Sequence, residues 1–136
     1  MSDVPGRIAI ALAAALVAAA LAVELRAHDL LAHASHRATA PKLTPAKLDA
    51  TLHDLNRVTD LRPGSQALLL AAGLDMRTRR YQDAERLAAH ATRREPDNFA
   101  TWVTLGVARS AAGDATGAKA AYARAHVLNP LYPVPR

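Results

Sequence analysis

Residues 99–132 read FATWVTLGVARSAAGDATGAKAAYARAHVLNPLY, and this stretch decides the fold. Apolar residues recur at helical spacing on both sides of Gly113 and Asp114, which predicts two short helices joined by a tight turn. Asp114 is suited to cap the second helix, and Pro130 prevents that helix from continuing. The stretch therefore predicts a helical hairpin.

The small residues of this hairpin predict that its two helices cross closely. Gly106 in the first helix and Ala118 in the second leave room for the close approach. Trp102 and Tyr122 are large enough to fill the wider spaces beside the crossing, because protein interiors are closely packed.

The preceding stretch, residues 65–98, has the same pattern one period earlier. The period, about 34 residues, and the pattern resemble the tetratricopeptide repeat, a helix–turn–helix unit. Residues 99–132 fit that repeat almost completely, except that Arg109 stands where the family usually has an aromatic residue. Residues 65–98 fit it less well. The matched pairs are Leu68 and Trp102, Ala72 and Gly106, Ala84 and Ala118, Ala91 and Ala125, and Pro96 and Pro130.

An earlier helix precedes these two units. Residues 45–61 have leucine and valine at spacings of three and four, which predicts one apolar helix face, and Pro63 with Gly64 ends it. We interpret residues 46–64 as a partial repeat or capping helix, with Ala50 placed one full period before Ala84. Residues 38–45 are a proline-containing linker, and residues 133–136 are a tail.

The N-terminal region, residues 1–37, predicts a membrane anchor followed by a juxtamembrane helix. The stretch that begins at Ile8 and ends at Val23 has no charged or polar side chain. It is slightly shorter than the roughly 20 residues that usually span a bilayer, and Arg7 and Arg26 can extend it by snorkelling. We expect an uncleaved single-pass anchor, with the C-terminal domain outside the cytoplasm.

Two alternatives to the anchor exist. In a cleaved signal peptide, Arg7 would be the basic region, and Ala20, Leu21 and Ala22 would form the cleavage site. This alternative makes the protein a secreted, soluble peptide-binding protein. A buried soluble helix is disfavoured, because an amphipathic helix should not lack polar positions over such a length. The predicted fold class is thus all-α, with an N-terminal transmembrane helix and a short α-solenoid of about two and a half repeats.

Composition excludes several functional classes. Apolar residues make up 51% of the chain but aromatic residues only 4%, so alanine-rich helices with thin cores are expected. The net charge is +5, yet the basic residues alternate with acidic ones, and we predict no nucleic-acid binding. The chain has no cysteine, which excludes disulfides and thiol chemistry.

The resemblance implies a partner-binding groove lined by the first helices of successive units. Such a groove accepts an extended or helical peptide, and here it would be mainly apolar, with Arg77 able to meet a carboxylate. The open end of the array is a further surface for a protein partner or a second copy of the chain. The matching groove positions are Gln66, Leu69, Gly73, Met76, Arg77, Val103, Val107 and Ser110.

Metal and catalytic sites are not expected, and neither is a cofactor. Asp29, His33 and His36 share one face of a continuous helix, but no fourth ligand accompanies them. No nucleophile lies on a glycine-flanked turn, and no glycine-rich phosphate loop is present.

The function expected from the sequence is that of a bacterial scaffold or adaptor, not an enzyme. It would bind or assemble membrane-associated protein partners. The resemblance extends to repeat segments found in cell-envelope glycan, secretion and pilus systems, and it rests on fold and composition alone.

Overall fold

The computed structural model describes residues 4–40, 44–61 and 64–133, and for residues 4–11 it describes the backbone only. Within these residues every element of regular secondary structure is an α-helix and there is no strand, which confirms the predicted all-α fold class. The helices are α1 (Val4–Ala38), α2 (Pro45–Leu61), α3 (Gln66–Arg77), α4 (Tyr81–Arg94), α5 (Phe99–Ala112) and α6 (Ala115–Leu128).

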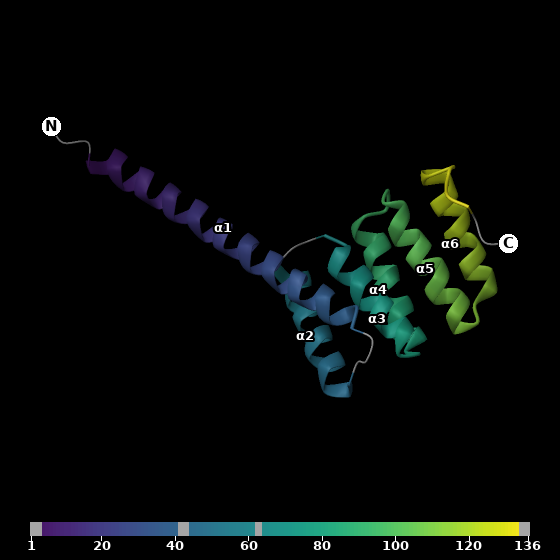
Figure 1. Ribbon diagram of the computed structural model, residues 1–136. Coiled ribbons are helices and arrows are strands. Elements are labelled where there is room, and N and C mark those ends of the chain that lie inside the picture. The colour runs from purple at the N-terminus through teal and green to yellow at the C-terminus, as the bar shows by residue number, and fades with distance from the viewer. Residues whose placement is uncertain (1–3, 41–43, 62–63, 134–136) are drawn as a thin grey trace.

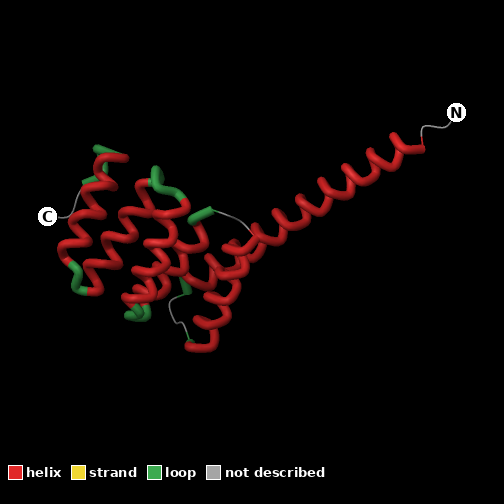
Figure 2. Tube along the Cα trace, turned by 180° about the vertical axis from the view of Figure 1, so that it is seen from behind, coloured by secondary structure: helices red, strands yellow, loops and turns green. Residues whose placement is uncertain are grey.

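The helices pair into successive hairpins that stack in one direction (Figure 1). α1 packs on α2, α3 on α4, and α5 on α6, while α3 also contacts α1 and α5. The first helices of the hairpins therefore form one row, with the second helices beside them. Figure 2 shows the same solenoid-like stack from behind.

Helix α1 has two parts with different surroundings. Its N-terminal half projects away from the stack, and Leu12, Leu16 and Leu21 are each more than half exposed (Figure 1). Its C-terminal half packs against α2 and α3, and its buried side chains recur at spacings of four, three and four, namely Ala27, Leu31, Ala34 and Ala38. The segment interpreted as a juxtamembrane helix is therefore the first helix of a further hairpin.

The structure does not support the predicted membrane anchor. Among the described residues, no helix has the combination of length and apolar character that a membrane crossing requires. The predicted single-pass anchor, and the membrane orientation derived from it, are contradicted by this finding.

Two small apolar clusters form the core. One joins α1, α2 and α3 through Leu31, Leu55, Val58 and Ala71, among others. The other joins α3, α4, α5 and α6, and includes Leu105. Because most members of the second cluster are alanines, the helices must approach closely to bury them.

Helix α2 shows a shift of one position from the predicted alignment. Ala50, which was aligned with the buried Ala84, is exposed. The buried residues of α2 are Thr51, Leu55 and Val58, and each precedes a buried alanine of α4 by one position less than the full period. Pro63 precedes Pro96 by the same shortened interval, so the shift was visible in the sequence. Pro63, linker residues 41–43 and tail residues 134–136 lie outside the described residues.

The two later hairpins share a turn conformation at matching positions of the repeat. Arg79 has a φ of 62° and Gly113 a φ of 91°, both in the left-handed region, and they lie one full period apart. Asp114 caps α6 as expected, because its carboxylate accepts a hydrogen bond of 2.8 Å from the Gly117 amide. The close crossing at Gly106 is also present, since an added Cβ there would lie 2.5 Å from the Tyr122 ring.

Candidate functional site

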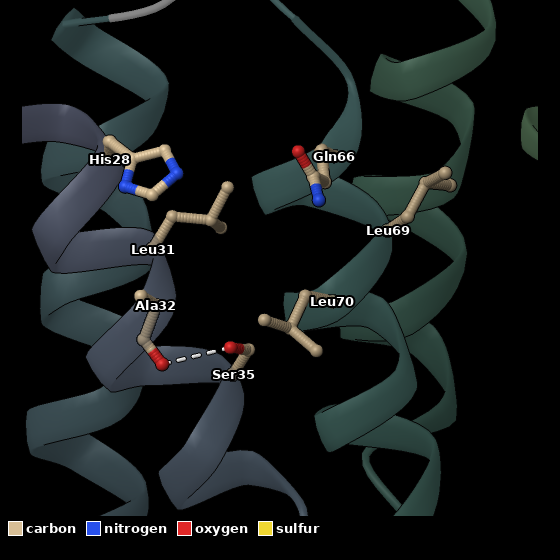
Figure 3. A pocket seen from close by; sticks show the side chains of 7 residues that line it. All are labelled: His28, Leu31, Ala32, Ser35, Gln66, Leu69 and Leu70. Carbon is tan, nitrogen blue, oxygen red and sulfur yellow. Dashed lines mark hydrogen bonds between the residues drawn. The ribbon is translucent and has the colours of Figure 1, made fainter. Parts of the chain in front are cut away.

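The candidate site is a groove between the C-terminal half of α1 and the start of α3 (Figure 3). Leu31 of α1 and Leu70 of α3 point toward one another across it. The groove encloses about 520 Å³ and is mainly apolar. We call it the α1–α3 groove and define it by its lining residues, His28, Leu31, Ala32, Ser35, Gln66, Leu69 and Leu70.

A second hollow continues this groove toward the loop before α5. The two hollows share Leu31, Gln66 and Leu69, so a ligand could extend from one to the other. The second hollow ends at Glu95 and Asn98, which lie in the loop between α4 and α5. The groove is therefore longer than the contact between α1 and α3 alone.

Hydrogen bonds hold the Glu95 carboxylate in place at this end. It accepts bonds from the Ser65 hydroxyl at 2.6 Å, the Ser65 amide at 2.7 Å and the Asn98 side-chain amide at 2.7 Å. These bonds, first that from the Ser65 side chain and then that from Asn98, hold the pKa of Glu95 below its ordinary value. The start of α3 and the loop after α4 are thereby fixed to each other.

The groove residues predicted on α3 do not all lie in this groove. Gln66 and Leu69 line it, whereas Gly73 lies further along α3 and Met76 packs against the second core cluster. The Arg77 guanidinium donates to the backbone carbonyls of Ala38 and Ala40, and so holds the end of α1 onto α3. Arg77 thus already has partners within the chain.

The positions predicted on α5 lie on the surface near α3. Val107 is 40% exposed, Ser110 is exposed and Val103 is partly buried. None of the three lines the α1–α3 groove, although α3 and α5 are in contact. Their role in partner binding stays a prediction.

The sequence reasoning missed the α1 wall of the groove. His28, Leu31, Ala32 and Ser35 were assigned to a juxtamembrane segment, but they form one side of the site. A signal was present, because Ala27, Leu31, Ala34 and Ala38 follow the spacing of a buried helix face. That face consists mostly of alanines, which are equally typical of an exposed helix, so the signal was weak.

The metal candidates lie on a different face of α1. Asp29, His33 and His36 are exposed, and none of them lines the groove beside His28 and Leu31. Within the described residues, no three side chains of the metal-binding types gather closely enough to hold an ion.

Comparison with known proteins assigns no family. No family model and no curated protein matches the chain.

Proposed function

We propose that the chain is a small helical-repeat binding protein, similar to the tetratricopeptide-repeat type, that holds an apolar peptide segment of a protein partner in the α1–α3 groove. The observation that carries this proposal is the pair of facing leucines, Leu31 and Leu70, between the first helices of adjacent hairpins. Repeat arrays of this kind use the row of first helices to bind extended or helical peptides.

The composition of the groove favours a ligand that is apolar at its centre and polar at its edges. Leu31, Leu69 and Leu70 provide the apolar surface, and His28 and Gln66 provide hydrogen-bonding groups beside it. Binding sites typically combine an apolar surface with a few well-placed polar groups. Because Glu95 is held by three hydrogen bonds, the far end of the groove is already ordered before a ligand arrives.

The polar groups of the groove support binding more than catalysis. The Ser35 hydroxyl donates to the Ala32 carbonyl of its own helix at 2.8 Å, so its proton is not held by a base. A nucleophile needs a neighbouring base to be activated. We therefore infer a scaffold or adaptor role for the chain.

A peptide-display selection against the full chain tests the proposal. We expect enrichment of segments with apolar side chains at helical or extended spacing. The affinity of a selected peptide, measured by calorimetry, should fall at least tenfold for Leu69→Glu, because a carboxylate would be placed in the apolar surface.

A matched substitution distinguishes this groove from general apolar adhesion. Val127 on α6 is 68% exposed and lies far along the chain from the groove, so Val127→Glu should leave the affinity unchanged. An equal loss for Val127→Glu and Leu69→Glu, or no saturable peptide, would refute the proposed function.

A further inference from the structure

A separate cleft, distinct from the α1–α3 groove and from the hollow that continues it, lies on the other side of α3. It is formed by α2, α3 and α4 and encloses about 400 Å³. Ala71 and Asp75 line this cleft from α3, whereas Gln66 and Leu70 line the α1–α3 groove. At about 100° per residue these two pairs lie on nearly opposite faces of the helix. The two sites share no lining residue, so one can be tested without the other.

A buried carboxylate oxygen without a hydrogen bond lies in this cleft. Asp75 is 1% exposed, and its Oδ1 accepts no hydrogen bond from the described residues. Its nearest cation is Arg80, whose Nε lies 3.2 Å from Oδ1 as an ion pair and equally far from Asp83 Oδ2. Buried polar atoms nearly always have hydrogen-bond partners, so Asp75 is an acceptor that lacks a donor.

The next hairpin shows what fills the corresponding place. Arg109 lies one full period after Asp75, and its Nε meets Glu85 of the preceding hairpin at 3.0 Å. Arg109 also lies 3.9 Å from Asp114, which repeats the Asp75–Arg80 pair with the charges exchanged.

The α2 position that corresponds to Glu85 holds Leu52. Leu52 precedes Glu85 by the same interval that separates the buried residues of α2 from the buried alanines of α4. Leu52 lines the cleft. No charged side chain from α2 therefore meets Asp75. Between α4 and α5, the ion pair of Glu85 and Arg109 closes this position. Between α2 and α3, the corresponding position is an open cleft.

The α4 side of the cleft supplies cationic groups. Arg86 and Arg93 line it two helical turns apart. Arg86 is bonded to Asp83, whereas Arg93 makes no hydrogen bond or ion pair within the described residues. Burial, together with the nearby Arg94 and Arg93, holds the pKa of His90 below its ordinary value.

We propose that this cleft binds an acidic peptide segment. Carboxylates of the peptide pair with Arg93 and Arg86 at the rim, and an amide or hydroxyl of the peptide donates to Asp75 at the base. Leu52 and Leu87 contact the peptide between these points. The two turns from Arg86 to Arg93 span about 10 Å. In an extended peptide, glutamates two or four residues apart lie on one side, at about 7 or 13 Å, so the long arginine side chains can reach them.

Fluorescence anisotropy with the full chain tests the proposal. The probe is a labelled hexapeptide of alternating glutamate and serine, with a lysine–serine hexapeptide of equal length as the charge control. We expect saturable binding of the glutamate peptide alone. Arg93→Gln should weaken it about tenfold, the effect of losing one charge-assisted pair. Arg124→Gln should leave it unchanged, because Arg124 is an exposed arginine on α6 that pairs with Asp97 away from the cleft.

The substitution Leu52→Arg separates a built site from general charge attraction. The new guanidinium would occupy the cleft and pair with Asp75, as Glu85 pairs with Arg109. We expect Leu52→Arg to bind the glutamate peptide at least tenfold more weakly, although the protein gains a positive charge. Circular dichroism checks that the variant keeps its helices.

Three results would overturn the proposal. They are tighter binding by Leu52→Arg, an equal effect of Arg93→Gln and Arg124→Gln, and the absence of saturable binding by the wild-type chain. Arg93 is exposed, so Arg93→Gln keeps the test decisive if Leu52→Arg does not fold.

Discussion

Arg79 has a positive φ, a backbone conformation for which the next hairpin uses a glycine, Gly113, at the corresponding position. Its φ of 62° is in the left-handed region, where a side chain costs about 1 kcal/mol or more. Glycine removes that strain but gives the unfolded chain more conformational freedom. We expect Arg79→Gly to raise the free energy of unfolding by about 0.5 kcal/mol, as measured by urea denaturation.

The matched control for this position is Gly113, which has a φ of 91°. Gly113→Ala should lower the free energy of unfolding by about 1 kcal/mol, because the added Cβ is strained at positive φ. If Arg79→Gly destabilises the protein as much as Gly113→Ala does, the turn is not held in the left-handed conformation.

The contact between Gly106 and Tyr122 leaves no room for a side chain. A Cβ at Gly106 would lie 2.5 Å from Cε1 and 2.7 Å from Cδ1 of the Tyr122 ring. The ring is buried and cannot easily move, so α5 and α6 would be forced apart. Gly106→Ala should destabilise the fold by about 1 to 2 kcal/mol in thermal or urea unfolding, despite the better helix propensity of alanine. Adding Tyr122→Leu should recover part of the loss; no recovery would argue against this contact.

At the scale of elements, Glu95 joins the loop after α4 to the start of α3. Its pKa is lowered in the folded state, so the stability that it contributes is present above its unfolded value of about 4.5 and is lost as the pH falls through the folded value. We expect Glu95→Gln to lower the free energy of unfolding by about 1 kcal/mol at pH 7. The difference from the wild type should disappear well below pH 4.5, and a difference that stays constant across this range would contradict the role of the charge.

The described side chains of the projecting half of α1 lie outside the core. Among the described side chains of the helix, the first buried one is Ala27, and Leu12, Leu16 and Leu21 are exposed. A chain that lacks residues 1–22 should therefore melt within about 2 °C of the full chain, because none of the side chains described as buried is removed. This is also the chain that the alternative signal cleavage after Ala22 would leave. A large drop in melting temperature would show that the projecting half stabilises the stack.

The sequence predicted most of the elements because their signals are local. The leucine spacing indicated the bounds of α2, and the turn at Gly113 separated α5 from α6. The alignment of α2 failed because a threonine, Thr51, fills the buried position and leaves the alanine beside it in solvent. The second half of α1 was missed because its buried face consists mostly of alanines, which are equally typical of an exposed helix.

At the scale of the whole molecule, only half of the groove could be predicted. The α3 side, Gln66 and Leu69, followed from the repeat pattern, whereas the α1 side depends on how the first hairpin packs. The capture of Arg77 by the carbonyls of Ala38 and Ala40 is a tertiary contact that no local pattern contains. The open cleft at Asp75 likewise became visible only when the two hairpins were compared in space.

The binding surface proposed for the whole molecule is the α1–α3 groove, and methyl-labelled NMR with a selected peptide tests this most directly. Leucine methyl signals report the groove and the other end of the stack separately. We expect the signals of Leu31, Leu69 and Leu70 to shift on titration, while those of Leu105 in the second core cluster and Leu128 at the end of α6 stay in place. Shifts confined to Leu105 and Leu128, with Leu31, Leu69 and Leu70 unchanged, would contradict it.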